Sequence, residues 1–312
     1  MDSLLLSLRI VAPLFIMMAL GYAIKQTGMM NETSVRQVNK VCFKIFLPLL
    51  VFLNIYNTDL EESFNAPLLT FALVGFAIQL ASSFAIVMLA QKDNSRRGVM
   101  MQGMFRGNFV LFAVPMATSL FGAEAAGEAS ILIAVIIPLY NAFAVIVLSM
   151  FGGGKPDFSK MLKGIATNPL IIASLLGILA VATGFKLPGF AYKLVDDIAG
   201  IATPLAFIIL GASFSFGDVS GYVKELSLTL GMKLVVYPLI AIVAAIALGF
   251  RDAPLAVLMT MFAAPVAVSS FTMAQQMGGD DKLAGQIVVF SSTIAIFTMF
   301  LMIFALKELA FI

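Results

Sequence analysis

Long apolar runs alternate along the chain with short segments of charged, glycine and proline residues. An α-helix crosses the hydrocarbon core of a bilayer with about 20 apolar residues, so the pattern predicts about ten membrane spans. The expected fold class is therefore an all-α integral membrane protein. The predicted spans lie at residues 4–24, 39–56, 68–90, 98–121, 128–150, 167–184, 197–214, 224–249, 254–277 and 284–306.

One connector, GGGKPDFSKMLKG, is longer than the other loops and lies near the middle of the chain. The predicted spans divide equally on its two sides, with an odd number on each side. An odd number places the two halves upside down relative to each other. We therefore predict a first five-helix repeat at 1–151, a connector at 152–166 and a second, inverted five-helix repeat at 167–312.

The basic residues of the loops predict the orientation, because cytoplasmic loops carry an excess of Lys and Arg. The loops after the odd-numbered spans hold Lys25, Arg36, Lys40, Lys92, Arg96, Arg97, Lys155, Lys160, Lys163, Lys224 and Lys282. The opposite side holds Lys186, Lys193, Arg251 and Lys307. We expect a multi-pass protein of the inner (cytoplasmic) membrane, with the connector in the cytoplasm and both termini outside it.

Two predicted spans carry a proline at corresponding places in the two halves. Pro115 interrupts the span at 98–121, and Pro265 interrupts the span at 254–277. A proline removes a backbone donor and leaves polar groups that lipid cannot satisfy. Taken singly, each proline is equally consistent with a kinked structural helix. Broken helices at matching positions in both halves indicate the substrate site of a secondary transporter.

Polar and small residues gather around both prolines, and the N-termini of half-helices offer partial positive charge to a carboxylate. Asn141 is a further polar residue inside a span, and it can equally bridge two helices or touch substrate. The candidate substrate-binding residues are Asn108, Gly107, Thr118, Asn141, Lys233, Ser269 and Ser270, with Pro115 and Pro265 at the crossover of the broken helices.

Two basic residues lie inside predicted spans. We interpret Arg106, near the cytoplasmic end of its span, as an anchor whose long side chain reaches the headgroups. Lys233 lies roughly 13 Å into its span at about 1.5 Å per residue. A lysine at a helix centre costs about 2.5–3.5 kcal/mol on insertion scales. Two interpretations of Lys233 stay open: snorkelling to the membrane surface, or a charge in the transport cavity that holds an organic anion.

Composition supports the membrane class and narrows the chemistry. Hydrophobic residues make up 61% of the chain and charged residues 12%, against about 45–50% and about 25% in soluble domains. The chain has no histidine and a single cysteine, Cys42, so the commonest metal ligands and general bases are missing. We expect no metal, no cofactor and no enzymatic activity. The net charge of +2 gives no indication of a nucleic-acid partner.

Three stretches resemble the auxin efflux carrier family, which includes plant PIN-type auxin carriers and bacterial permeases for malate, malonate and similar acids. The stretch NPLIIASLLGILAVATGFKLPGFAYKLVDDIAGIATPLAFIILGASF at 168–214 is similar to the family's signature region. GNFVLFAVPMATSLFG at 107–122 resembles the family's fourth helix, and AAPVAVSSFTMAQQMGGD at 263–280 resembles its ninth. The resemblance extends over essentially the whole chain.

The resemblance implies two inverted five-helix repeats, and crossing broken helices that move as a rigid elevator against a dimerised scaffold. It places Asn108 in the substrate site and Pro115 and Pro265 at the crossover. The sequence departs from the family in two ways. The long cytoplasmic loop of many plant members is missing, and the usual threonine-glycine stretch after Gly-Asn reads FVLF at 109–112. A small carboxylate is therefore expected ahead of auxin, although an apolar wall suits a hydrophobic acid.

The sequence as a whole predicts a secondary transporter of a small organic anion that works by alternating access in a lipid bilayer, as a homodimer. Because every Asp and Glu lies in a loop or at the end of a span, we expect driving by the membrane potential or by exchange. One alternative is a cation-coupled carrier or antiporter of the same fold. Another is a membrane sensor that binds a ligand without transporting it.

Overall fold

A computed structural model describes residues 2–57, 65–122, 125–152, 164, 166–214 and 216–312. The secondary structure of these residues is helical apart from one isolated antiparallel bridge. The α-helices are α1 (Asp2–Gln26), α2 (Glu32–Val41), α3 (Leu47–Tyr56), α4 (Ala66–Ala90), α5 (Asn94–Phe105), α6 (Phe109–Phe121), α7 (Ala126–Phe151), α9 (Pro169–Thr183), α10 (Gly189–Ala199), α11 (Ala202–Ser213), α12 (Val223–Gly231), α13 (Tyr237–Ala247), α14 (Asp252–Ala263), α15 (Ser269–Gln276) and α16 (Asp281–Glu308).

Within the described residues, six helical stretches are long and apolar enough to cross a membrane. They are Glu32–Tyr56, Ala66–Ala90, Ala126–Phe151, Gly189–Ser213, Val219–Ala247 and Asp281–Glu308, and α6, α9 and α14 are shorter apolar helices. The expected all-α membrane protein is confirmed at this level. The number of crossings and the inverted relation of the two halves stay predictions.

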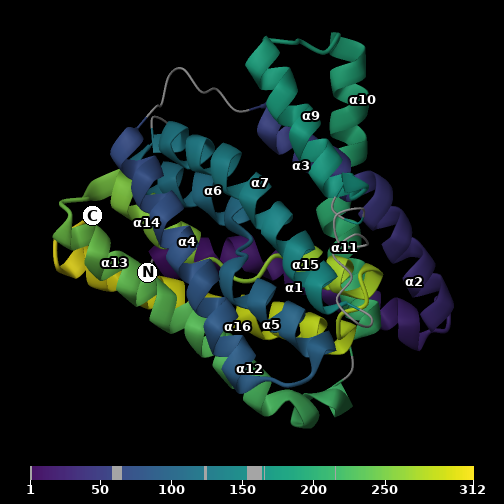
Figure 1. The fold of residues 1–312 in the computed structure, drawn as a ribbon. Coiled ribbons are helices and arrows are strands. Elements are labelled where there is room, and N and C mark those ends of the chain that lie inside the picture. Colours follow the sequence, from purple (N-terminus) through teal and green to yellow (C-terminus); the bar gives the residue numbers. More distant parts are fainter. Residues whose placement is uncertain (1, 58–64, 123–124, 153–163, 165, 215) are drawn as a thin grey trace.

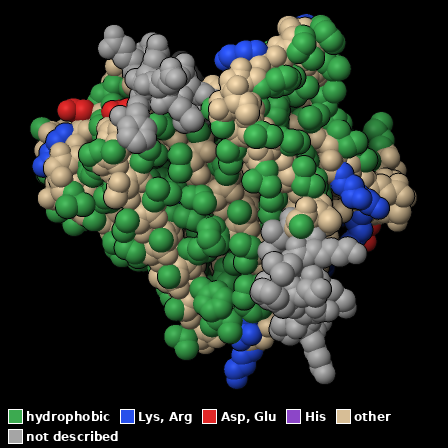
Figure 2. Space-filling view, turned by 45° about the horizontal axis from the view of Figure 1, so that its top comes forward, with side chains coloured by type: hydrophobic (Ala, Val, Ile, Leu, Met, Phe, Trp, Pro, Cys, Tyr) green, Lys and Arg blue, Asp and Glu red, His purple; other side chains and the backbone are tan. Residues whose placement is uncertain are grey.

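The surface of the molecule fits a lipid environment. Leu175, Phe297 and Leu301 are each about 60% exposed (61%, 60% and 59%). Figure 2 shows a face covered mainly by hydrophobic side chains, with Lys and Arg at its margins. Exposing so much apolar surface to water would be unfavourable, whereas contact with lipid acyl chains carries no such free-energy cost.

The helices form two groups. The first group contains α1, α2, α3, α9, α10 and α11, and in it α1 packs on α11 while α3 packs on α9 and α10. Figure 1 shows α3, α9 and α10 together at one side of the molecule. The second group contains α4 to α7 and α12 to α16, with α5 on α7, α6 on α14 and α15 on α16. The two groups meet where α1 packs on α16 and α3 packs on α7.

Glycines let α1 and α11 approach until their backbones touch. A Cβ added at Gly21 would lie 1.9 Å from the carbonyl oxygen of Ile208, and one added at Gly211 would lie 1.9 Å from that of Met18. Both distances are far below van der Waals contact, so only glycine fits. Small residues at such interfaces are typical of helix pairs in membranes, where close packing rather than exclusion from water drives association.

Two helices of the second group are interrupted, and the interruptions cross each other. The helix formed by α5 and α6 is broken at Arg106–Asn108, and that formed by α14 and α15 is broken at 264–268. Gly107 and Val266 form the isolated antiparallel bridge, and the backbone N–H of Asn108 donates to the carbonyl of Pro265 at 2.6 Å. We call this pair of segments the crossover.

The predicted position of one break needs correction. Pro265 lies in the second interruption, as expected, but Pro115 lies inside α6, which continues to Phe121. A proline removes one helical hydrogen bond but does not by itself end a helix. The chain breaks earlier because Gly107 leaves the helix to pair with the other segment.

Candidate substrate cavity

A cavity of about 100 Å³ lies beside the crossover, between the two helix groups. The first group contributes α3, Leu170 of α9 and Thr203 of α11. The second group contributes the crossover, the start of α6, α7 and Ser269 of α15. The cavity therefore has walls on both groups, and a relative movement of the groups would change its shape and its access.

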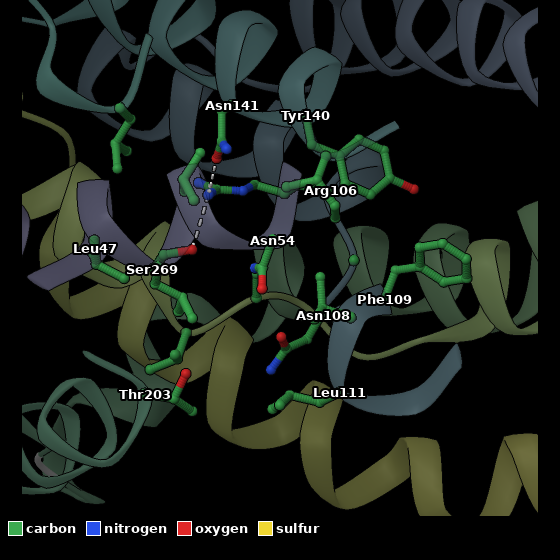
Figure 3. A pocket seen from close by; sticks show the side chains of 18 residues that line it. Leu47, Asn54, Arg106, Asn108, Phe109, Leu111, Tyr140, Asn141, Thr203 and Ser269 are labelled. Carbon is green, nitrogen blue, oxygen red and sulfur yellow. Dashed lines mark hydrogen bonds between the residues drawn. The ribbon is translucent and has the colours of Figure 1, made fainter. Parts of the chain in front are cut away.

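Among the described residues that line the cavity, Arg106 is the charged one. Its side chain is buried, with 4% exposure, and its guanidinium points toward Asn141 and Ser269 while the ring of Phe109 points the opposite way (Figure 3). Nη2 donates to Oδ1 of Asn141 at 2.6 Å and to Oγ of Ser269 at 2.8 Å, and Nη1 donates to the sulfur of Met273. Each of these partners is neutral.

Among the described residues, no carboxylate forms an ion pair with Arg106. A buried charge without a partner of opposite sign is strongly unfavourable. The guanidinium fork also matches the two oxygens of a carboxylate. The cavity is therefore electrostatically incomplete and complementary to an anion.

The interpretation of Arg106 as a headgroup anchor is wrong. α5 begins at Asn94, where Asp93 caps it by accepting from the N–H of Ser95 at 2.9 Å. Twelve helical residues precede Arg106, which is about 18 Å at 1.5 Å per residue. That length, with the 4% exposure of the side chain, places the guanidinium in the protein interior rather than at the surface.

The cavity wall brings together four of the candidate residues: Gly107, Asn108, Asn141 and Ser269. The backbone of Asn108 is fixed by its bond to Pro265, and its side chain does not cap α6. Asn141 is 1% exposed, and its Nδ2 group has no hydrogen-bond partner among the described residues. A buried amide donor without a partner is a second group that a ligand in the cavity can satisfy.

Thr118, Ser270 and Lys233 do not line this cavity. Thr118 bonds back into its own helix, its hydroxyl donating to the carbonyl of Val114 at 2.9 Å. Ser270 is 2% exposed, and its carbonyl accepts from Nε2 of Gln102 at 3.0 Å. Lys233 has 0% exposure, so the snorkelling interpretation is wrong. Its ammonium lies next to Gly107, but Lys233 does not line the cavity.

Sequence reasoning missed four polar members of the wall: Arg106, Tyr140, Asn54 and Thr203. A usable signal existed for Arg106, which directly precedes the Gly-Asn pair, and for Asn54, a polar residue in an otherwise apolar stretch. The predicted apolar contribution of the FVLF stretch is present, since Phe109, Val110 and Leu111 line the cavity.

In the described part of the chain, no group of three or more His, Cys, Asp or Glu side chains is placed so that it could hold a metal ion. The polar atoms of the cavity come from one guanidinium, amides and hydroxyl groups. This set is suited to hydrogen bonding with an anion rather than to chelating a metal.

A family model described as Membrane transport protein matches residues 7–156 and 157–303. The chain belongs to this family. The match confirms the resemblance to the auxin efflux carriers, and together with the apolar helices it establishes a multi-pass membrane protein.

Several relatives carry transporter names. An uncharacterized transporter from Methanocaldococcus jannaschii is 27% identical over 66% of this chain and 68% of its own. One from Methanothermobacter thermautotrophicus is 21% identical over 93% of this chain and 95% of its own. A Rhizobium meliloti protein named "Putative malonate transporter" is 22% identical over 93% of this chain and 92% of its own. Family and relatives agree on membrane transport.

Proposed function

We propose that this protein is a secondary transporter that carries a small organic anion across the cytoplasmic membrane by alternating access. The observation that carries the proposal is Arg106, a buried cation in the wall of a cavity at the crossover, which pairs with no carboxylate of the described residues. A substrate carboxylate would accept charge-assisted hydrogen bonds from its guanidinium fork. The name of the Rhizobium relative supports an organic acid as substrate.

The wall of the cavity favours a small carboxylate. The positive charge of Arg106 binds one carboxylate, and the amides of Asn108 and Asn141 supply neutral donors for a second oxygen-bearing group of the substrate. Leu47, Leu50 and the start of α6 close the cavity with apolar side chains. A short mono- or dicarboxylate fits both the polar and the apolar parts of the wall. An auxin-like aromatic acid is larger, so the cavity of about 100 Å³ would have to widen to hold it.

The proposed architecture is ten spans in two inverted five-helix repeats. Two features support it. Helix pairing follows the symmetry, since span one (α1) packs on span seven (α11) and span two (α3) packs on span six (α9). Spans four and nine are broken at matching places and bridge each other. The orientation with both termini outside the cytoplasm is part of the proposal.

In the proposed cycle the first helix group is the scaffold and the second is the transport domain, which moves as an elevator. The position of the cavity between the groups supports this division, because the scaffold supplies one wall and the moving domain the other. The scaffold is also the part through which two copies would associate as a homodimer.

Replacing Asn108 with Ala tests the site. We expect uptake of the substrate anion into proteoliposomes to be lost, while the protein stays folded, because a cavity donor next to Arg106 disappears. Thr118→Val is the matched control, since the Thr118 hydroxyl bonds within α6 outside the cavity and its removal should leave uptake unchanged. Unchanged uptake in Asn108→Ala would contradict the site.

The substrate is found by a thermal-shift screen of the purified protein against mono- and dicarboxylates, aromatic acids and cations, because a ligand of the folded state stabilises it by mass action. Two outcomes would replace the proposal. Uptake that requires sodium would identify a cation-coupled carrier. Ligand binding without counterflow of the labelled anion would identify a sensor.

A further inference from the structure

Lys233 is a buried cation that the proposed anion site does not use. Its ammonium donates to the carbonyl oxygen of Phe262 at 3.2 Å, and the side chain has no exposed surface. A Cβ added at Gly107 would lie 3.1 Å from Nζ and 3.4 Å from the carbonyl oxygen of Ala264. The ammonium thus lies between Gly107 and the carboxyl end of α14, and Lys233 does not itself line the cavity.

The place that Lys233 occupies is where the carboxyl ends of two half-helices meet. α14 ends at Ala263, directly after Phe262, and α5 ends at Phe105, two residues before Gly107. The carboxyl end of an α-helix carries roughly half an elementary negative charge. Two such ends together carry about one negative charge, which one ammonium neutralises. No carboxylate of the described residues forms an ion pair with Lys233.

At the end of α5, a neutral side chain makes the hydrogen bond that corresponds to the bond of Lys233 at the end of α14. Nε2 of Gln79, in α4, donates at 2.9 Å to the carbonyl of Met104, the last but one residue of α5. Phe262, the partner of Lys233, is likewise the last but one residue of α14. A neutral amide is therefore sufficient as a hydrogen-bond donor at this position. The positive charge of Lys233 must serve a further purpose.

The local backbone supports a specific placement of Lys233. It lies in a π-helical turn, Met232–Val236, between α12 and α13. Such turns insert one residue into a helix and are frequent at functional sites. The turn packs on α5, α14 and α16, and two of these helices, α5 and α14, end at the crossover.

We propose that Lys233 is a built-in cation of the crossover, which takes the place of a free monovalent cation and lets the carrier work without one. Removing its side chain should leave an empty site between the carbonyl oxygen of Phe262 and Gly107 that accepts ammonium, methylammonium or sodium. This inference deepens the proposed function and rests on it for the transport measurement alone.

The binding experiment uses Lys233→Ala in detergent, with chloride salts of choline, sodium, ammonium and methylammonium compared at equal ionic strength. We expect methylammonium or ammonium to raise the Tm of Lys233→Ala by about 2 °C or more over choline. The wild type and Lys224→Ala, which removes an exposed lysine nine residues earlier, should show no preference among the cations. Equal Tm values of Lys233→Ala in all four salts would overturn the proposal.

The transport experiment uses Lys233→Gln, which keeps a donor for Phe262 as Gln79 does for Met104. We expect wild-type anion uptake to be equal in choline and sodium, and uptake by folded Lys233→Gln to fall at least about tenfold. A sodium requirement in the wild type, or wild-type uptake in Lys233→Gln, would overturn the proposal. If the wild type moves no organic anion, the proposed function fails, and the Tm comparison still decides the role of Lys233.

Discussion

Arg106 and Lys233 place two positive charges next to Gly107 at the crossover. The two side chains have different hydrogen-bond partners, and these indicate different roles. Arg106 contacts the neutral groups of Asn141 and Ser269 in an open cavity. Lys233 contacts the carbonyl of Phe262 at a helix end, in a place without solvent access. The first charge is left for a ligand, and the second is compensated by the protein backbone.

At the residue scale, replacing Arg106 with Gln should weaken binding of the substrate anion by about 10- to 150-fold, because hydrogen bonds to charged groups contribute about 1.5–3 kcal/mol. The dissociation constant, measured by calorimetry or by anion-dependent thermal shift, checks this. Arg106→Lys keeps the charge but loses the planar fork, so its dissociation constant should lie between those of the wild type and Arg106→Gln. Wild-type affinity in Arg106→Gln would remove Arg106 from the site.

The sequence predicted some of these residues and missed others for physical reasons. Asn108 and Asn141 could be named as candidates because an amide inside an apolar span is recognisable without tertiary information, and both line the cavity. Arg106 was misplaced because its depth depends on where α5 begins, and the capping Asp93 sets that start well before the apolar run. Asn54 carries the same amide signal and was overlooked, whereas the cavity position of Thr203 depends on how α11 packs, which a pattern along one chain does not contain.

At the element scale, the contact of α1 with α11 depends on glycine. Gly211→Ala should destabilise the protein by about 1–3 kcal/mol or more, because the added methyl overlaps the backbone of Met18 and forces the helices apart. Gly231→Ala is the matched control in another helix, where a Cβ has no heavy atom within 4 Å and should stabilise by about 0.5–1 kcal/mol. Thermal unfolding of both variants, monitored by helical circular dichroism, checks the pair. A Gly211→Ala variant as stable as the wild type would contradict the close contact.

Helix breaks were only half predictable. The break near Pro265 coincides with the proline, whereas the matching break lies at Arg106–Asn108 and α6 runs on through Pro115. Gly107 pairs with Val266, which is distant in sequence, and this pairing decides where α5 ends. Proline signals a local weakness of a helix, but the tertiary contact determines whether the chain breaks there.

At the scale of the whole molecule, a polar chain of contacts joins the two helix groups. Nδ2 of Asn39 in α2 donates to Oε1 of Gln275 at 2.7 Å, and Nε2 of Gln275 donates to Oδ2 of Asp281 at 2.9 Å. Arg36 of α2 approaches the same carboxylate at 3.7 Å. These contacts cross from the proposed scaffold to the proposed transport domain, so an elevator movement must break them.

Linking the two groups should therefore stop transport. We expect an Asn39→Cys/Gln275→Cys pair, in a Cys42→Ala background that removes the native thiol, to lose uptake after reaction with a short bifunctional thiol reagent that dithiothreitol can reverse. Gln275→Cys/Asp281→Cys, a pair within the second group, is the control and should keep its uptake when linked. Continued uptake by the cross-linked Asn39–Gln275 protein would contradict movement between the groups.

The membrane environment and the family were predictable at this scale because they depend on composition and on motifs spread over the chain. The number of crossings, the relation between the two halves and the association of two copies are properties of arrangement. Apolar periodicity gives the lengths of spans, but short helices such as α9 and α14 need their neighbours before their depth is defined.

Because Arg106 pairs with no carboxylate in the described part of the chain, its charge also determines how voltage acts on the proposed cycle. The site is positively charged when empty and neutral when it holds a monocarboxylate, so an electric field does work on the empty carrier alone. A full crossing of one charge corresponds to about 2.3 kcal/mol per 100 mV. An interior-negative potential pulls the vacant site inward, which assists the return step after export and opposes it after import. A cell at rest would thus use this protein more readily to expel a monocarboxylate than to accumulate it.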